Sequence, residues 1–379
     1  MTNYNALALK KHKQLKGKLS VQLKDDLDSK EKLSIYYTPG VGAVSSYLAE
    51  HPEATRDYTW TNNLVAVISD GSAVLGLGDI GPRAALPVME GKAMLFKHFG
   101  GIDAVPIVLD VHTADEIVAA VAAIAPSFGG INLEDIAAPI CFEVEDRLKE
   151  MLPIPVMHDD QHGTAVVALA ALINAVRLTN RQLSNCKLVL VGAGAAGVAT
   201  AKLLLQYAPG ITIVAVDSKG IISNQRTDLN VSKRALLKLT NPEDVSGSLA
   251  HALHGADILI GVSQANLVSG PMVRSMAKAP IIIAMANPVP EIMPDIAKAA
   301  GVGVIATGRS DFPNQVNNAL AFPGIFRGAL DNHVHKITDE HKIKAAEVIA
   351  ALVQKPSAEN IIPHISDPRL VSAIADIIR

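Results

Sequence analysis

Residues 187–217 begin with Lys187-Leu188-Val189-Leu190-Val191, continue with Gly192-Ala193-Gly194-Ala195-Ala196-Gly197 and end with Ile211-Thr212-Ile213-Val214-Ala215-Val216-Asp217. Both apolar runs have the composition of a strand that is buried on both faces. The Ala- and Leu-rich segment between them favours a helix. The order strand, helix, strand, with G-x-G-x-x-G in the first turn, predicts a Rossmann-type doubly wound unit that binds a dinucleotide at this turn.

The glycines of this motif predict how the turn would hold the dinucleotide. Gly192 permits the tight turn, Gly194 lets the backbone approach a pyrophosphate, and Gly197 allows the helix to pack closely on the strand. Ala195 and Ala196 open the helix, whose N-terminus presents unpaired N–H groups and the positive end of its dipole to phosphates. The alternative is a glycine-rich turn of an α/β fold that binds no ligand.

Asp217, at the end of the second strand, bears on which dinucleotide binds. It lies about 20 residues beyond the last glycine, where a carboxylate can accept a hydrogen bond from a ribose hydroxyl. This position favours NAD, because a carboxylate repels a 2′-phosphate. Lys219 follows shortly after and could bind that phosphate, so NADP remains open as the second cofactor.

The composition of the chain narrows its class. The chain has 379 residues, of which 49% are hydrophobic and 19% charged, and it contains 27 glycines. These values are typical of an α/β enzyme with two or three domains. A net charge of −3 gives no general attraction to nucleic acid or membranes, and the longest apolar stretches, such as 165–176, are too short to span a bilayer. Cys141 and Cys186 lie in apolar surroundings without paired spacing, which indicates reduced core side chains and a cytoplasmic protein.

The rest of the chain alternates between apolar runs and helical segments. Strands are expected at 64–68, 74–77, 105–109, 130–133, 154–157, 257–262, 280–284 and 303–306, and helices at 44–50, 91–97, 114–124, 142–151 and 165–178. Pro39 and its neighbouring glycines predict a turn, and Gly163 predicts a loop. We expect residues 1–162 to form an N-terminal α/β substrate and metal domain with a helical arm. Residues 163–379 would form the dinucleotide-binding domain with C-terminal helices.

Two pairs of acidic residues, Glu134-Asp135 and Asp159-Asp160, each follow a predicted strand directly. Ligands of open α/β sheets gather beyond the carboxyl ends of the strands, so the two pairs can converge. Clustered carboxylates without thiolates favour Mg²⁺ or Mn²⁺. Taken singly, either pair could instead cap a helix. A further alternative is a Zn²⁺ site made by His158 and His162.

Lys92 and Tyr37 are the remaining candidates for chemistry. Lys92 lies in an otherwise apolar helix, where burial beside a divalent cation would lower its pKa and make it a base. The alternative is a surface lysine whose aliphatic stem covers apolar residues. Tyr37 stands at the predicted glycine-rich turn, and its alternative role is that of an aromatic anchor in the core.

The sequence resembles the malic enzymes, in particular their short bacterial form. The likeness covers nearly the whole chain and is carried by the segments Tyr37–Val41, Leu75–Gly81, Pro87–Lys92, Leu133–Ile136, His158–Thr164, Ala286–Glu291 and Thr307–Asp311. One departure stands out. Larger animal relatives carry an arginine that grips the substrate carboxylate in the segment 70–76, where this chain has Ala73.

The resemblance implies a role for each matching residue. Glu134, Asp135 and Asp160 correspond to the metal ligands, Lys92 to the general base, Tyr37 to the general acid, Asp159 to the carboxylate beside the lysine, and Asn287 and Asn318 to amides that contact the substrate carboxylate and the nicotinamide. It further implies that the substrate is L-malate and that the protein is a homodimer.

Three functions are compatible with these features. The leading one is oxidative decarboxylation of L-malate to pyruvate and CO₂ with reduction of NAD or NADP, in which Lys92 removes the hydroxyl proton and Tyr37 protonates C3. A related alternative is a metal-dependent oxaloacetate decarboxylase that retains the glycine motif as a relic. A nicotinamide-sensing binding protein is a third, and the complete set of catalytic and metal-binding residues argues against it.

Overall fold

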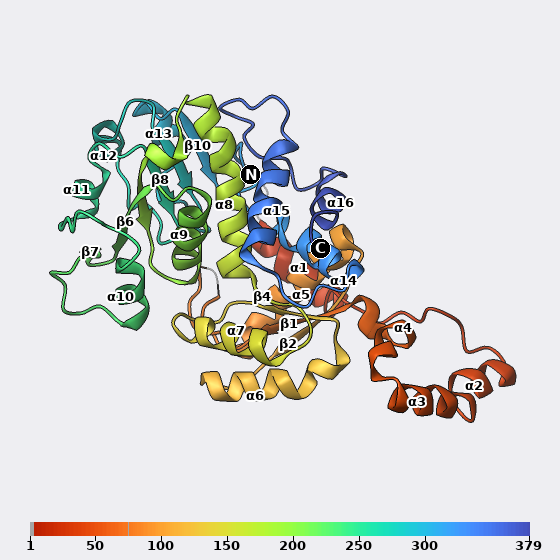
Figure 1. Cartoon of the computed structure of the whole chain (residues 1–379). Coiled ribbons are helices and arrows are strands. Elements are labelled where there is room, and N and C mark those ends of the chain that lie inside the picture. The colour runs from red at the N-terminus through yellow and green to blue at the C-terminus, as the bar shows by residue number, and fades with distance from the viewer. Residues whose placement is uncertain (1–3, 75) are drawn as a thin grey trace.

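The computed structural model describes residues 4–74 and 76–379 (Figure 1). Two mostly parallel β-sheets, each covered by helices, form the body, and helices from the C-terminal part pack between them. The predicted α/β class is therefore confirmed. The predicted strand at 74–77 includes residue 75, which lies outside the described residues. Val74 forms an isolated bridge with Gly78.

The first sheet has four parallel strands in the order β2-β1-β3-β4. Their bounds are β1 Leu64–Ser69, β2 Asp103–Val108, β3 Gly130–Leu133 and β4 Val156–His158. One face packs on α6 (Ala114–Ile124) and α7 (Ile140–Met151). The other face packs on α5 (Pro82–Gly100), whose buried residues recur with helical spacing along one side.

The second sheet has six strands in the order β10-β9-β8-β5-β6-β7. Their bounds are β5 Lys187–Val191, β6 Thr212–Asp217, β7 Gly220–Ile221, β8 Ile258–Gly261, β9 Ile281–Ala284 and β10 Val304–Thr307. All neighbours are parallel except β6 and β7. The chain order reverses at β5, which lies between β6 and β8. In doubly wound sheets this reversal opens the crevice where ligands bind.

Helix α8 (Asp159–Leu178) joins the two sheets (Figure 1). It begins directly after β4 and packs against α9 (Ala195–Tyr207) and α15 (Asp339–Ala351). With 20 residues it is long and apolar enough to cross a bilayer, so the length argument made for 165–176 fails. However, 72% of its apolar window is buried inside the protein, as is typical of a core helix.

The predicted loop at Gly163 is wrong, because this residue lies in the second turn of α8. A Cβ atom at Gly163 would lie 1.9 Å from Asp159 Oδ1. Glycine is therefore needed here so that the Asp159 side chain can fold back against its own helix. The expected boundary between 162 and 163 accordingly falls inside a continuous helix.

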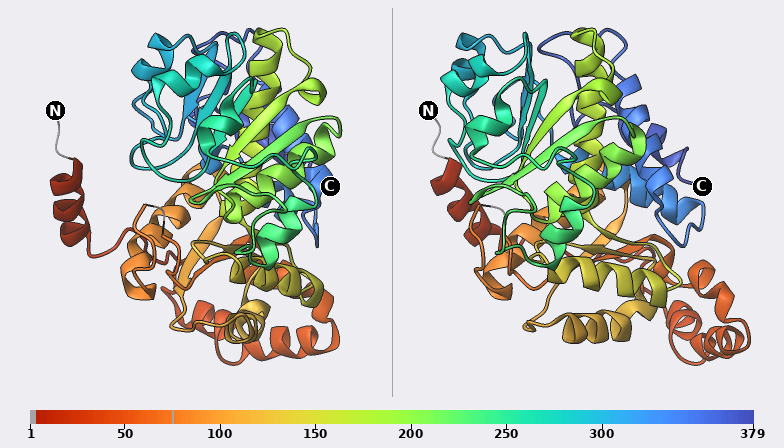
Figure 2. Two further views of the ribbon diagram at one scale, coloured as in Figure 1. Left: turned by 90° about the vertical axis from the view of Figure 1, so that its left-hand side faces the viewer. Right: turned by 60° about the vertical axis from the view of Figure 1, so that its left-hand side comes forward.

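The N-terminal arm consists of α1 (Tyr4–Leu15), α2 (Lys30–Tyr36) and α3 (Gly40–Glu50), and none of their residues is buried. Figures 1 and 2 show α2 and α3 as a lobe that projects from the body, with α1 standing off another side. The predicted turn at Pro39 is the N-cap of α3, so the helix expected from residue 44 begins at Gly40.

The remaining elements are short or belong to the C-terminal part. The α-helices are α4 Thr55–Tyr58, α10 Val231–Leu237, α11 Leu249–Leu253, α12 Gly270–Ser275, α13 Pro294–Ala299, α14 Phe322–Asp331 and α16 Leu370–Ala375. The 3₁₀-helices are Pro52–Ala54, Trp60–Asn63, Ala125–Ser127, Leu183–Asn185 and Asn318–Leu320.

Three buried phenylalanines tie α5 to α14. The ring centroid of Phe96 lies 4.7 Å from that of Phe322 and 5.3 Å from that of Phe326. All three side chains are fully buried. Aromatic rings at these separations add to the stabilisation from apolar burial, so this cluster fixes α5, and with it Lys92, against the C-terminal helices.

We expect Phe96→Ala to lower the free energy of unfolding by about 3–5 kcal/mol, because it leaves a cavity between the two helices. Chemical denaturation monitored by circular dichroism measures the change. Val88→Ala, on the exposed side of α5, is the matched control and should have little effect. Equal effects of both substitutions would contradict the proposed packing role of Phe96.

Candidate active site

Strand register brings the two acid pairs together. Leu133 of β3 is paired with His158 of β4 in a parallel ladder. The next residues, Glu134 and Asp159, therefore leave adjacent strands at the same edge of the sheet. The backbone N–H of Asp135 donates to Asp160 Oδ2 at 2.7 Å, so the two pairs are joined directly. The convergence expected from the sequence is confirmed.

Glu134, Asp135 and Asp160 form a three-carboxylate group. Each offers an oxygen atom, and these ligand atoms lie within 4.8 Å of one another. Asn132 Nδ2 donates to Glu134 Oε2 at 3.0 Å and orients that carboxylate. The structure therefore brings the three predicted metal ligands together.

The structure gives no support to a zinc site made by the two histidines. His162 Nε2 lies 2.8 Å from Glu145 Oε2, and burial lowers the pKa of His162 to about 4 although Glu145 opposes the shift. Neither His158 nor His162 joins a metal-type cluster among residues 4–74 and 76–379.

The electrostatics of the three-carboxylate group fit a hard divalent cation. Burial raises the pKa of Glu134, and it raises the pKa of Asp160 to about 6, with the charge of Asp159 adding to the effect. Buried carboxylates that repel one another need a cation to stay ionised. Because all donors are oxygen atoms, the chemistry of the site suits Mg²⁺ or Mn²⁺.

Lys92 lies at the back of this group. Its Nζ donates to Asp159 Oδ2 at 2.6 Å and lies 2.8 Å from Glu134 Oε1. The Phe322 ring lies below it, with its centroid 4.4 Å from Nζ. The Lys92 side chain is 8% exposed, which excludes the surface lysine considered above.

Burial and the neighbouring carboxylates shift the pKa of Lys92 in opposite directions. Burial alone would lower the pKa of Lys92, but the carboxylates of Asp159 and Glu134 outweigh it and raise the pKa above the usual value. Burial also raises the pKa of Asp159 to about 6. The lowered lysine pKa expected from the sequence therefore requires that the charge of these carboxylates be offset.

A cavity of about 420 Å³ opens between the two sheets in front of the acidic group. Its lining includes Asp135 and Asp160 on one side and Gly194, Ala195 and Ala196 on the other. Two of the three predicted metal ligands and the dinucleotide turn thus face a common space. This volume lies within the range of cavities that hold small-molecule ligands.

The glycines of the turn have the backbone geometry that the motif predicts. Gly192 has a φ of 113°, in the region that disfavours side chains. A Cβ on Gly197 would lie 1.9 Å from Gly192 O, which explains the close packing of α9, whereas a Cβ on Gly194 would meet nothing within 4 Å. The turn is therefore tightly packed at Gly197 and open at Gly194.

Asn287 and Asn318, which follow β9 and precede α14, line the same cavity. Ala73 also lines this cavity, in the segment where the resemblance gives larger animal relatives an arginine. Among the described lining residues the two asparagines, with Thr164, Ser263 and Asn317, supply uncharged polar groups. Glu291 is fully buried and holds two lining loops in place by accepting from the backbone N–H groups of Ser263 and Ala286.

Two predicted residues lie outside this arrangement. Tyr37 is 66% exposed on the projecting arm and is absent from the described lining of the cavity. Asp217 ends β6 as predicted, but its carboxylate is bonded to Arg226 and Lys233. The Rossmann pattern allows a basic residue near this point, yet the sequence alone does not show that Arg226 and Lys233 reach Asp217. No local pattern places Phe322 under Lys92 either.

Comparison with known proteins agrees with this arrangement. Residues 16–149 match the model of the malic enzyme N-terminal domain, and residues 161–377 match that of the malic enzyme NAD binding domain. The bifunctional malic/malolactic enzyme of Bacillus subtilis is 52% identical over 372 residues, which cover 97% of this chain and 90% of that protein. The NAD-dependent malic enzyme of Geobacillus stearothermophilus is 51% identical, with 94% of this chain and 75% of that protein covered.

A solved structure extends the likeness to three dimensions. The crystal structure of the NAD-dependent malic enzyme from Thermotoga maritima superposes with a TM-score of 0.95 at 49% identity and covers 98% of both chains. Both family models, the close relatives and the shared fold lead to one conclusion: the chain belongs to the malic enzyme family, whose members catalyse the oxidative decarboxylation of malate.

Proposed function

We propose that the protein oxidises L-malate in the cavity between the two sheets and releases pyruvate and CO₂, with NAD or NADP as the hydride acceptor. The observation that carries the proposal is the contact of Lys92 with Asp159 and Glu134. The next residues in the chain, Asp160 and Asp135, line the same cavity as the dinucleotide turn. We assign residues 1–162 to the substrate and metal domain and 163–379 to the dinucleotide domain. The two free, buried cysteines are compatible with a cytoplasmic protein.

The acidic residues would bind a divalent cation, and Lys92 would act as the base. When bound by Glu134, Asp135 and Asp160, Mg²⁺ or Mn²⁺ would act as a Lewis acid on the substrate hydroxyl. Its charge would also offset the carboxylates that hold the pKa of Lys92 high, so that Lys92 can accept the hydroxyl proton. Asp159 would keep the lysine in position through its 2.6 Å hydrogen bond.

The opposite wall of the cavity would bind the cofactor and the far end of the substrate. NAD or NADP supplies the hydride acceptor when bound. The N-terminus of α9 would bind its pyrophosphate at Gly194. Asn287 and Asn318 would donate to the substrate carboxylate and the nicotinamide amide, which is the task left to uncharged groups where Ala73 replaces an arginine.

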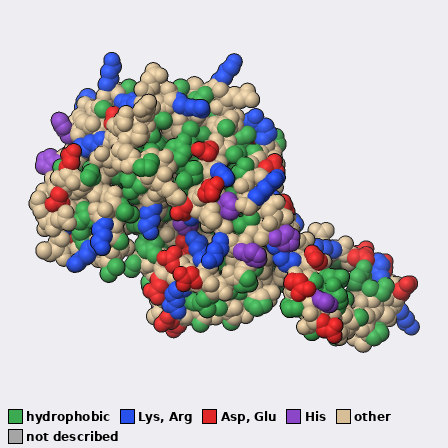
Figure 3. Space-filling model, viewed as in Figure 1, with side chains coloured by type: hydrophobic (Ala, Val, Ile, Leu, Met, Phe, Trp, Pro, Cys, Tyr) green, Lys and Arg blue, Asp and Glu red, His purple; other side chains and the backbone are tan. Residues whose placement is uncertain are grey.

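Tyr37, the proposed proton donor to C3, would come from the partner of a homodimer. The arm that carries it has no buried residue and exposes several large apolar side chains, as the projecting lobe in Figure 3 shows. They are Leu33, Ile35, Tyr36, Tyr37, Val41, Val44 and Tyr47. An exposed apolar patch of this kind marks an interaction surface. A two-fold dimer would exchange the arms and bring the partner's Tyr37 to each cavity.

Subunit complementation tests this dimer. Tyr37→Phe and Lys92→Ala should each lower malate oxidation by about 10²- to 10⁴-fold, because each removes a proton-transfer group. In co-expressed mixtures of the two variants, hybrid dimers would contain one intact site, so roughly a quarter of the wild-type activity should return. Mixtures as inactive as their parents, in dimers shown to be hybrid by two affinity tags, would place Tyr37 in its own subunit's site or outside catalysis.

Metal binding should depend on pH because protons and the cation compete for the same buried carboxylates. Since the pKa of Asp160 is raised to about 6, the apparent affinity for Mn²⁺ should fall as the pH drops below about 6 and level off above it. Titration of Mn²⁺ by electron paramagnetic resonance measures this. Asp160→Asn should abolish tight binding, and Asp115→Asn on the surface should not. An affinity that is the same at acid and neutral pH would refute the assignment.

A substitution in the dinucleotide turn should weaken cofactor binding and leave the metal site working. Gly194→Val places a side chain in the open space where the pyrophosphate would bind. The affinity for NADH, measured by fluorescence titration, should therefore fall at least about tenfold, with the melting temperature unchanged. Mn²⁺-dependent decarboxylation of oxaloacetate should persist, since it needs only the metal and a proton source.

Gly197→Val is the contrasting variant, because its side chain would collide with the Gly192 carbonyl and should destabilise the fold. A folded Gly194→Val variant that lost both activities would contradict the separation of the two sites.

A further inference from the structure

Glu145 is a buried carboxylate that the proposed chemistry leaves unused. It lies on α7, and 3% of its side chain is exposed. Oε1 accepts from the backbone N–H of His158 at 2.9 Å and lies 2.6 Å from Lys149 Nζ. Oε2 accepts from Gln161 Nε2 at 3.2 Å and lies 2.8 Å from His162 Nε2. A carboxylate has about four lone-pair sites, so these four groups occupy all of them.

Three of the four partners flank the acid pair Asp159-Asp160. One is the residue directly before the pair, and the other two are the residues directly after it. Glu145 therefore holds the chain on both sides of the pair, and it does so from a different helix.

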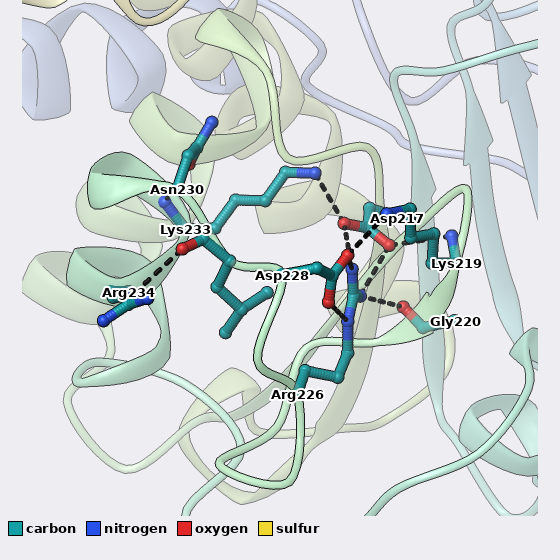
Figure 4. Close-up of polar contacts among 9 residues, drawn as sticks. Asp217, Lys219, Gly220, Arg226, Asp228, Asn230, Lys233 and Arg234 are labelled. Atoms are coloured by element: carbon teal, nitrogen blue, oxygen red, sulfur yellow. Dashed lines mark hydrogen bonds and ion pairs between the residues drawn. The ribbon is translucent and has the colours of Figure 1, made fainter.

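The ion cluster around Asp217 is built differently (Figure 4). Its carboxylate accepts from the backbone N–H of Lys219 and from the side chains of Arg226 and Lys233. All these donors belong to the segment that follows β6, so the cluster stabilises a local turn. The contacts of Glu145 instead join α7 to the start of α8.

Helix α8 begins without a cap from its own chain end. His158 is the N-cap residue, and its side chain makes no capping hydrogen bond. In a capping box, a glutamate of the first helical turn accepts from the N-cap N–H. Glu145 accepts from that N–H across the gap between two helices, and a carboxylate at this end also interacts favourably with the helix dipole. Glu145 thus supplies from α7 the acceptor that the first turn of α8 lacks.

The two acids in this turn have different partners that both depend on its position. Asp159 accepts from Lys92 Nζ at 2.6 Å, and Asp160 accepts from the backbone N–H of Asp135 at 2.7 Å. A rotation of the turn would displace both carboxylates. Glu145 itself is absent from the three-carboxylate group and from the described lining of the active-site cavity, so any effect on the site must pass through the turn.

We propose that Glu145 is a positioning residue of the active site, which fixes the first turn of α8 so that Asp160 meets the cation while Asp159 meets Lys92. Glu145 acts through the reach of its hydrogen bonds, and Lys149 balances its charge. The inference rests on the proposed function, because it requires a cation at the three-carboxylate group.

Two substitutions separate reach from charge. Glu145→Asp keeps the charge but is one methylene shorter, which draws the carboxylate back from the turn. Glu145→Gln keeps the length. Its amide oxygen can accept from the His158 N–H and from Lys149, and its NH₂ group can donate to His162 Nε2 in the tautomer that accepts there.

Titration of Mn²⁺ by electron paramagnetic resonance at neutral pH measures the effect on the metal site. Glu145→Asp should weaken Mn²⁺ binding about 10- to 100-fold, which is the usual loss when a residue that orients a metal ligand is changed. Glu145→Gln should bind Mn²⁺ nearly as tightly as the wild type. Glu143→Ala is the matched control, because Glu143 lies on the same helix, is 59% exposed and pairs with Arg147. It should leave the affinity unchanged.

Hydrogen exchange in the metal-free protein gives a readout that needs no cation. The backbone N–H of His158 should exchange faster in Glu145→Asp, because it loses its acceptor. It should stay protected in Glu145→Gln and in Glu143→Ala. The affinity for NADH should be the same in all three variants, which separates a shift of the turn from general destabilisation.

Several results would overturn the inference. One is wild-type Mn²⁺ affinity in Glu145→Asp. Another is a larger loss in Glu145→Gln than in Glu145→Asp, which would mean that charge counts and reach does not. If Glu145→Asp does not fold, a tenfold loss in folded Glu145→Gln has the same consequence. Equal losses of Mn²⁺ and NADH affinity would reduce Glu145 to a general structural role. A wild-type protein that binds no Mn²⁺ would refute the proposed metal site, and this inference with it.

Discussion

The ion cluster of Lys92 with Asp159 and Glu134 is the interaction on which the active site depends. It joins α5, the end of β3 and the start of α8 within 2.8 Å contacts. Neither the lysine nor the acids can be buried alone, and removing one member of a buried pair typically costs about 3–5 kcal/mol. The elements that carry these residues must therefore meet for the first sheet to be stable. Phe96 and Phe322 hold α5 in the position that allows this contact.

The same cluster connects the metal-binding and dinucleotide-binding halves of the molecule. Helix α8 begins with Asp159 of the cluster and continues as the buried helix on which α9 packs. The N-terminus of α9 presents the open side of Gly194 to the cavity. The distance between Asp159, which contacts Lys92, and the dinucleotide turn is thus set by the packing of α9 on α8. This explains why a chemistry that needs both can take place in a single cavity.

The sequence predicted the parts of the structure that depend on local pattern. Strand β5, helix α9 and strand β6 were recognised because continuous apolar runs and three spaced glycines leave few alternatives. The meeting of the acid pairs followed from the rule that parallel strands end at one edge of the sheet. Predictions failed where a residue serves a distant or unusual contact. Gly163 looked like a loop residue, but it makes room for the Asp159 side chain inside α8. The partners of Asp217 lie on α10 and in the preceding loop, and no spacing rule locates them. The exposure of Tyr37 depends on how the whole arm leaves the body.

The proposed chemistry depends above all on the binding of a divalent cation by the three-carboxylate group beside Lys92. The most direct test is a crystal structure with Mn²⁺, in which anomalous scattering locates the ion independently of any refined coordinates. We expect one strong peak within coordination distance of the carboxylates of Glu134, Asp135 and Asp160, on the side that faces the cavity. A strong peak at His158 and His162, or none at the three carboxylates in crystals that show Mn²⁺ elsewhere on the protein, would contradict it.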